Sequence, residues 1–282
     1  MLGHSESPAR SVTAPTVLPA TRAPYLARMP LVATDGIVLH AFDYMESSRI
    51  VRLATRDAGL QSVIAKGARR TRGKQGASLD LFAEGAARLS MRPGRDLHTL
   101  TGFDVTRSRP ELAADLGRFA AASAIAELVL RFAHDDEHTA LYDSLLATLD
   151  ALALAPPGGA RVVALAGAWR LVADLGFAPA LDLCAQCHRA LDADADADFS
   201  HREGGALCPS CARGRAGLRA LPASARATIR DWLQGRASTT PLDDATGRAH
   251  QRLLREFLHE HLADGRPMRA FDIWESARWA GE

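Results

Sequence analysis

The sequence predicts an α+β protein that begins with a small β-barrel and continues as an α-helical domain with an inserted four-cysteine module. Three observations support this fold class. Short β-rich segments occupy residues 31–105, apolar residues recur at helical spacing from Ser108 onward, and the four cysteines lie within residues 181–215. We therefore expect a barrel domain over residues 29–107 and a helical domain over residues 108–282.

Residues 1–28 differ in composition from the rest of the chain. They are rich in Ser, Pro, Ala, Thr and Arg, contain one acidic residue and show no periodicity. This composition is typical of a disordered arm, although a transit peptide has a similar one. A third interpretation is that translation starts at Met29, which directly precedes the first strand pattern.

Five short strands are predicted in the barrel domain. They cover Leu31–Leu39, Arg49–Thr55, Leu60–Ala65, Ala86–Met91 and Leu97–Val105. Turn sequences at 57–59 and 93–94 join the second strand to the third and the fourth to the fifth. So many strands in so few residues indicate a compact Greek-key barrel of the OB type, a fold that binds oligonucleotides in many proteins.

The segment after the third predicted strand is strongly basic. It carries five cations and no acid within nine residues, namely Lys66, Arg69, Arg70, Arg72 and Lys74. Arg92 and Arg95, at the next predicted hairpin, would extend this surface. A basic loop on an OB barrel suits the phosphates of single-stranded nucleic acid, although a solvated loop or a sorting signal has the same composition.

Aromatic residues that could stack on bases are scarce in the predicted barrel. The candidates are Phe42, Tyr44, Phe82 and Phe103. Most aromatic side chains of so small a barrel are expected in its core.

Helical periodicity dominates the rest of the chain. Helices are predicted over 108–132, 138–152, 162–175, Ser224–Gln234 and Thr246–Ala263. The string Ser108-Arg-Pro-Glu111 predicts a capping box at the start of the first of these helices. Gly176 predicts a C-terminal cap at the end of the third. We expect packing roles for the tryptophans and surface or packing roles for the histidines of the last helix: Trp169, Trp232, Trp274, Trp279, His250, His259 and His261.

Cys184, Cys187, Cys208 and Cys211 form two C-x2-C pairs separated by 20 residues. This spacing is typical of a structural zinc site, in which four thiolates close the coordination shell and leave no position for water or substrate. Two disulfides would require an oxidising compartment, and no signal-peptide pattern supports export. Attachment of a c-type haem at the first pair would leave the second pair unexplained.

The residues around the cysteines leave two questions open. The alternating Asp-Ala tract over 192–198 is expected to be a solvated loop tip, because it lacks the glycine and distal glutamate of a calcium-binding EF-hand loop. Four arginines flank the cysteines, namely Arg189, Arg202, Arg213 and Arg215. They would either stabilise the negative charge of a zinc–thiolate site or contact phosphate.

The chain shows no motif of an enzyme or of a membrane protein. A glycine-rich phosphate loop, a nucleophile elbow and a metalloprotease helix are absent from the sequence. No apolar run is long enough to span a bilayer. We therefore expect a non-enzymatic, cytoplasmic protein without a membrane partner.

Several strings, in this order, resemble the RecO family of bacterial recombination mediators. They are Asp35-Gly-Ile-Val-Leu39, Ala65-Lys-Gly-Ala-Arg-Arg70, Leu100-Thr-Gly102, Leu175-Gly-Phe-Ala-Pro179, Leu183-Cys-Ala-Gln-Cys187 and Gly204-Gly205. The resemblance covers residues 29 to 265 and excludes the two ends of the chain.

The resemblance implies an OB barrel, a helical domain and a four-cysteine site for Zn²⁺. It implies a protein of DNA repair and recombination that binds single- and double-stranded DNA, anneals complementary strands and acts at the nucleoid. Its partners would be RecR and the C-terminal tail of single-strand-binding protein, with RecA loaded indirectly. By position, Lys66, Arg69 and Arg70 would contact DNA, whereas Arg72 and Lys74 fall where loop length varies.

Two other functions remain as alternatives to a DNA-binding mediator. They are a protein–protein adaptor without DNA binding and a metal-dependent nucleic-acid enzyme.

Overall fold

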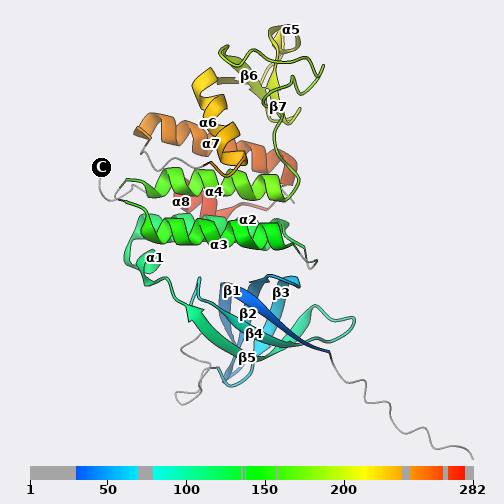
Figure 1. Cartoon of the computed structure of the whole chain (residues 1–282), viewed down its shortest axis with the longest axis vertical. Coiled ribbons are helices and arrows are strands. Elements are labelled where there is room, and N and C mark those ends of the chain that lie inside the picture. Colours follow the sequence, from blue (N-terminus) through cyan, green and yellow to red (C-terminus); the bar gives the residue numbers. More distant parts are fainter. Residues whose placement is uncertain are drawn as a thin grey trace, which may run out of the picture.

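The computed structural model describes residues 30–68, 79–134, 136, 138–156, 158–236, 242–262 and 266–276. The molecule is elongated, with the β-barrel at one end, the cysteine module at the other end, and layers of helices between them (Figure 1). The predicted α+β class is therefore confirmed. The predicted arm over 1–28, Trp279 and the basic residues from Arg69 to Lys74 lie outside the described residues.

The barrel is closed by five strands in the order β1-β2-β3-β5-β4. Their bounds are β1 (Leu31–Tyr44), β2 (Ser48–Thr55), β3 (Gly59–Ala65), β4 (Glu84–Ser90) and β5 (Leu97–Arg107). Neighbours run antiparallel except β3 and β5, which run parallel. Alternate residues such as Val51, Leu53 and Val63 fill the interior, as expected from the two-residue period of a strand. This five-stranded barrel confirms the OB-type prediction.

Seven helices of the described residues form the layers above the barrel. They are α1 (Pro110–Ala114), α2 (Leu116–Phe132), α3 (Thr139–Leu154), α4 (Ala160–Asp174), α6 (Ala223–Leu233), α7 (Asp244–Leu262) and α8 (Arg269–Ser276). The fully buried Trp169, Trp232 and Trp274 confirm the predicted packing role. Gly176 has a φ of 86°, which agrees with its predicted position after the helix end.

The first predicted helix is wrong in two details. It is divided at Asp115, whose extended backbone ends α1 and whose carboxylate accepts a hydrogen bond from the backbone N–H of Arg118 at the start of α2. The predicted capping box is also wrong, because Arg109 and not Ser108 occupies the N-cap position and makes no side-chain cap.

Helix α8 was not predicted at all. Glu127 of α2 accepts hydrogen bonds from the backbone N–H groups of Ala270 and Phe271 at its start.

A buried arginine joins the barrel to the helices. The side chain of Arg109 is 1% exposed and donates to the backbone oxygen of Phe82 at 2.8 Å, to Asp150 at 2.7 Å and to Glu84 at 3.0 Å. Barrel residues Ile37 and Leu60 also belong to the same hydrophobic cluster as the helices. The barrel is thus packed against the helical layers and not merely tethered to them.

The cysteine module has a small sheet that was not predicted. Strands β6 (Ala197–Ser200), β7 (Gly205–Leu207) and β8 (Arg219–Leu221) form it in the order β7-β6-β8, and α5 (Pro209–Ala212) follows β7. The fully buried Phe199 attaches the module to α7, with its ring centroid 6.0 Å from that of Phe257. The acidic tract forms a turn but enters β6 from Ala197, so the predicted loop tip is correct only for its first part.

Candidate functional site

A β-bulge in β1 divides the outer surface of the barrel into two zones. The pairing of β1 with β2 shifts between Val38 and His40, which leaves Leu39 as the extra residue. Before the shift, the outward-facing Ile37 packs into the helical core. After the shift, Ala41 packs against the barrel interior, so His40 and Phe42 face outward. The bulge therefore marks where the barrel leaves the helices.

The second zone, beyond the bulge, is not covered by the helices. We call it the open face and define it by His40, Phe42, Tyr44, Ile50, Arg52 and Ile64. Strand pairing aligns His40 with Arg52, Phe42 with Ile50, and Ile50 with Ile64. Phe42 is 44% exposed and Tyr44 is 36% exposed, whereas the other two stacking candidates, Phe82 and Phe103, are buried. Two of the four aromatic candidates therefore remain available on the surface.

Cations border the open face. Lys66 directly follows Ala65, which pairs with Arg49 of β2, so Lys66 leaves the sheet beside the Tyr44 end of the face. Among the described residues no carboxylate pairs with Lys66 or Arg52. The predicted loop residues Arg69, Arg70, Arg72 and Lys74 continue from Lys66, outside the described residues.

Arg92 and Arg95 do not lie beside Lys66. Ser62 pairs with Leu97 and Ala65 pairs with Leu100 in the parallel β3–β5 ladder. Arg92 and Arg95 precede Leu97, so they lie at one end of this ladder and Lys66 lies at the other. Both arginines are exposed, but any surface that includes all three cations must extend along the ladder.

Charge is distributed unevenly between the barrel and the rest of the chain. Residues 29–107 contain twelve Lys and Arg against eight Asp and Glu, a formal charge of +4. Residues 108–282 contain nineteen Arg against twenty-four Asp and Glu, a formal charge of −5. The near-neutral total hides this difference. A polyanion would be attracted to the barrel end of the molecule.

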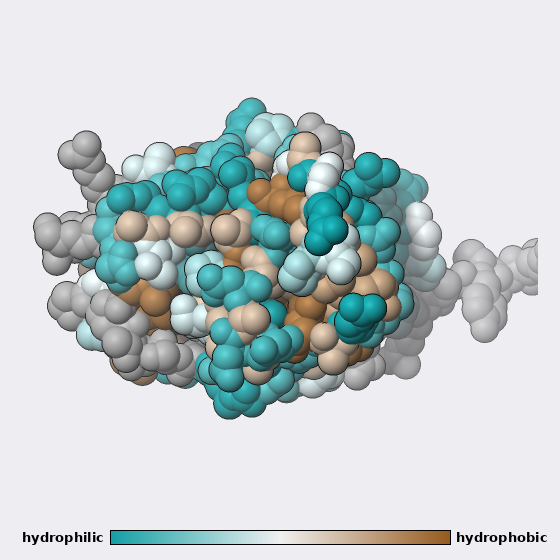
Figure 2. Space-filling view, turned by 90° about the horizontal axis from the view of Figure 1, so that it is seen from above, coloured by the Kyte–Doolittle hydropathy of each residue, from teal (hydrophilic) through white to brown (hydrophobic). Residues whose placement is uncertain are grey.

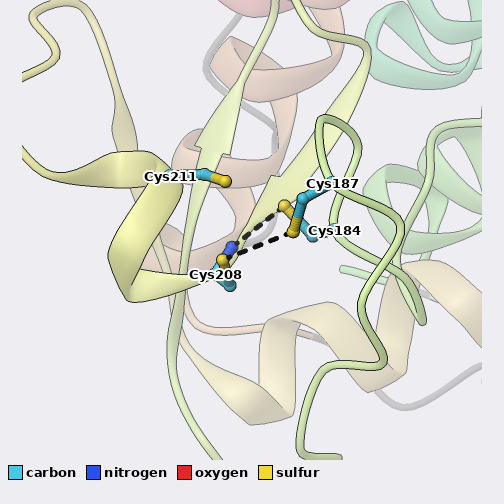
Figure 3. A group of neighbouring side chains, drawn as sticks. All are labelled: Cys184, Cys187, Cys208 and Cys211. Carbon is cyan, nitrogen blue, oxygen red and sulfur yellow. Dashed lines mark hydrogen bonds between the residues drawn. The ribbon is translucent and has the colours of Figure 1, made fainter.

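The four cysteines form a compact cluster at the other end. Their Sγ atoms all lie within 4.8 Å of one another, and the side chains point toward a common centre (Figure 3). The Sγ atoms of Cys187 and Cys208 are 3.8 Å apart. A tetrahedron with Zn–S bonds of about 2.3 Å has edges of about 3.8 Å, so the donor set fits zinc. All four cysteines are free, so the disulfide alternative is absent from the structure.

The surroundings of the four cysteines shift the pKa values of their thiol groups. Burial opposes ionisation of Cys184, but hydrogen bonds from the backbone N–H groups of Cys187, Cys208 and Gln186 outweigh it and lower the pKa of this thiol to about 6. The hydrogen bond with Cys208, followed by burial, raises the pKa of Cys211 to about 12. The pKa of Cys208 is also lowered, chiefly by a hydrogen bond from the backbone N–H of Cys211. Two of the thiols therefore ionise more readily than usual and Cys211 less readily, and a bound cation would favour ionisation of all four.

The arginines near the cysteines divide into two groups. Arg215 donates to Glu203 at 2.8 Å and to the side chain of Gln186, which ties the second cysteine pair to the first. Arg189, Arg202 and Arg213 are exposed and pair with no carboxylate of the described residues. However, residues 181–215 contain six acidic residues against these four arginines. Four thiolates around one zinc ion would add further negative charge.

Two cavities lie near α7. One, of about 1070 Å³, has a polar, charged lining between the cysteine module and α7, including His201, Arg202 and Glu260. The other, of about 530 Å³, is more apolar and lies between β8, α6 and α7, with Leu221, Leu253 and Arg252 in its lining. Seen from the module end, apolar surface occurs as small patches between hydrophilic residues (Figure 2).

The histidines of α7 agree with the predicted packing and surface roles. His250 is buried, with its ring 5.0 Å from that of Trp232, and burial lowers its pKa to about 4. His259 is exposed, and His261 contacts the backbone oxygen of His201 at 2.6 Å. No metal-binding group other than the cysteines occurs among the described residues.

None of the described helices is long and apolar enough to cross a membrane.

Comparison with known proteins gives the same family for both halves of the chain. Residues 29–109 match the family model described as Recombination protein O N terminal, and residues 113–270 match Recombination protein O C terminal. DNA repair protein RecO of Anaeromyxobacter sp. (strain K) is 37% identical over 86% of this chain and 96% of the relative. DNA repair protein RecO of Rubrobacter xylanophilus is 33% identical over 83% of this chain and 92% of the relative.

Proposed function

The chain belongs to the RecO family of DNA repair proteins, and from this premise we propose that it is a non-enzymatic recombination mediator. In this proposal it binds single- and double-stranded DNA and anneals complementary strands. It also helps RecR to load RecA onto single-stranded DNA that is covered by single-strand-binding protein. It would do so in the cytoplasm, at the nucleoid.

The observation that carries this proposal is the concentration of cations without acidic partners on the barrel. Lys66, Arg52, Arg92 and Arg95 pair with no described carboxylate, and residues 69–74 add four further cations in the sequence. Cations that are not neutralised within the protein can displace the counterions of a phosphate backbone, and this release drives binding. The helical layers, by contrast, carry net negative charge.

Annealing follows from the same charge. Two complementary strands repel each other through their phosphates, and a basic surface that neutralises one strand lowers the cost of bringing the second strand close. No proton transfer or bond cleavage is required. The barrel residues would therefore bind and position the strands, and base pairing would supply the driving force.

The apolar cavity between β8, α6 and α7 is the place we propose for the tail of single-strand-binding protein. The family resemblance implies that this tail is acidic and has an apolar end, and such a tail needs a cation beside a hydrophobic pocket. Leu221, Leu242 and Leu253 line this cavity, and Arg252 in its lining is exposed and has no described acidic partner. The buried His250 stays neutral near pH 7, so it does not add charge to the pocket.

We propose Zn²⁺ as the ion of the cysteine cluster and a structural role for it. Cys184, Cys187, Cys208 and Cys211 would hold it, and the four thiolates would complete its coordination. The ion would fix the loop that carries the first cysteine pair to α5, which carries Cys211. The contact between Phe199 and Phe257 would then hold the ordered module against α7.

An annealing assay tests the proposed function. Complementary oligonucleotides that carry a fluorophore and a quencher would be mixed with the full-length protein at low and physiological salt. We expect faster annealing at low salt, and a Lys66/Arg69/Arg70→Ala variant should lose most of the acceleration. Arg269→Ala is the matched control, because Arg269 is exposed, without a described acidic partner and located on α8. Failure of the wild type to bind or anneal DNA would favour the adaptor alternative.

A further inference from the structure

We propose that the open face of the barrel is a base-stacking platform, on which His40, Phe42 and Tyr44 hold the bases of single-stranded DNA. This inference rests on the proposed DNA binding and deepens it. The basic segment from Lys66 to Lys74 would supply attraction to any phosphate backbone, whereas the aromatic rings would select strands whose bases are free. Any preference for single strands would thus reside in β1 and not in the basic segment.

The geometry of β1 arranges the three rings in a row. His40, Phe42 and Tyr44 are separated by two residues each, so they project from the same face of one strand. The ring centroids of His40 and Phe42 are 5.7 Å apart. The partly buried Ile50 of β2 and Ile64 of β3 form an apolar surface beside Phe42. Rings held on strands keep their positions without a bound ligand, which favours binding.

The spacing of these rings suits separated bases and not a duplex. Side chains two residues apart on a strand are about 6.7 Å apart, and the ring centroids of His40 and Phe42 are 5.7 Å apart. Successive nucleotides along one strand of a duplex are about 3.4 Å apart. A duplex also hides the faces of its bases between neighbouring base pairs, so the rings could not reach them. Single-stranded DNA could place one base on each ring.

The charges beside the rings favour nucleic acid over a protein partner. Arg52 lies across from His40, and Lys66 leaves β3 beside the Tyr44 end of the row. Neither cation has a described acidic partner. Aromatic rings bordered by cations that are free to meet phosphate form the usual surface for single-stranded nucleic acid.

This arrangement also explains how a bound strand can be annealed. A base that stacks on a ring is held by its face, so its pairing edge stays accessible to a second strand. Once the pair forms, the base stacks within the duplex and leaves the ring. The platform would therefore bind the substrate of annealing and release its product.

Fluorescence anisotropy with three matched oligonucleotides tests the platform: a normal single strand, the same strand with abasic sites, and a duplex. Phe42→Ala and Tyr44→Ala should each weaken binding of the normal strand about tenfold. Binding of the duplex and of the abasic strand should change by less than about twofold, since neither presents base faces. Phe42→Trp should retain binding of the single strand.

Phe177→Ala is the matched control for folding and for general surface effects. Phe177 is 40% exposed, close to the 44% of Phe42, and follows α4 at a distance in sequence from the barrel. It should leave all three affinities unchanged. Thermal melting of each variant checks that the barrel stays folded.

The outcomes separate this inference from the proposed function. If the wild type binds normal and abasic strands equally and Phe42→Ala has no effect, DNA binding stands but the platform is wrong. If the wild type binds none of the three oligonucleotides, both proposals are wrong. If Phe42→Ala instead abolishes binding to RecR or self-association while DNA affinity is unchanged, the open face is a protein interface and the platform is again wrong.

Discussion

The two ends of the molecule both carry exposed arginines, but they differ in the charge that surrounds them. The barrel has a formal charge of +4 over residues 29–107, whereas residues 181–215 of the cysteine module have more acids than bases. Arg189, Arg202 and Arg213 thus lie in an acidic setting that four thiolates would reinforce. A polyanion is attracted by the local balance of charges and not by individual arginines.

The two ends also differ in how they join the helices between them. The barrel is attached through the buried Arg109, which contacts Glu84 and Asp150. The module is attached through aromatic packing of Phe199 on Phe257 and is organised internally by the cysteine cluster. Metal removal should therefore affect one end, and loss of one arginine should affect the other.

Removal of the metal is expected to give the largest effect. Binding of Zn²⁺ to four thiolates contributes on the order of 10 kcal/mol in small domains. A chelator, or the Cys208→Ser variant, should increase hydrogen exchange first in β6, β7 and β8, while amides of β2 and β3 in the barrel keep their protection. Unchanged exchange and an unchanged melting curve after chelation would refute the structural role of the metal.

Replacement of Arg109 by alanine should have the next largest effect. It leaves the partly buried Glu84 and the backbone oxygen of Phe82 without their cation, while Asp150 keeps its contact with Arg107. Breaking a fully buried pair costs about 3–5 kcal/mol, and we expect a loss near the lower end of that range. Urea denaturation should show this loss in the free energy of unfolding, with early exposure of the barrel junction.

Arg107→Ala provides the matched control for that measurement and the smallest expected effect. Arg107 contacts the same Asp150 at 2.6 Å, but its side chain is 50% exposed. Exposed ion pairs contribute up to about 1 kcal/mol. Equal losses for Arg107→Ala and Arg109→Ala would show that burial at the junction does not set the stability of the barrel attachment.

Much of this architecture follows from local sequence patterns. The five short strand patterns predicted the barrel, and the spacing of the four cysteines predicted that they would cluster. The division at Asp115 was missed because the apolar period continues across it, from Leu112 to Leu116. Strands β7 and β8 are only three residues long, too short to show a period.

The open face shows why the functional surface is harder to predict than the fold. The predicted first strand ended at Leu39, where the bulge begins, because the residues beyond it have no simple apolar alternation. The bulge sets the outward direction of the Phe42 side chain, and the packing of the helices determines which part of the barrel surface they cover. Phe82 and Phe103 have the same chemistry but are buried. Exposure therefore depends on tertiary packing, which the local pattern does not contain.

The most direct test of the difference between the two ends is the salt dependence of single-stranded DNA binding. Affinity would be measured across a range of salt for the wild type, for Lys66/Arg69/Arg70→Ala and for Arg189/Arg202/Arg213→Ala. Each phosphate contact contributes about −0.7 to the slope of log affinity against log salt. We expect the barrel variant to reduce the slope by about 2 and the module variant to leave it unchanged. A reduced slope in the module variant and an unchanged slope in the barrel variant would contradict the assignment of DNA binding to the barrel.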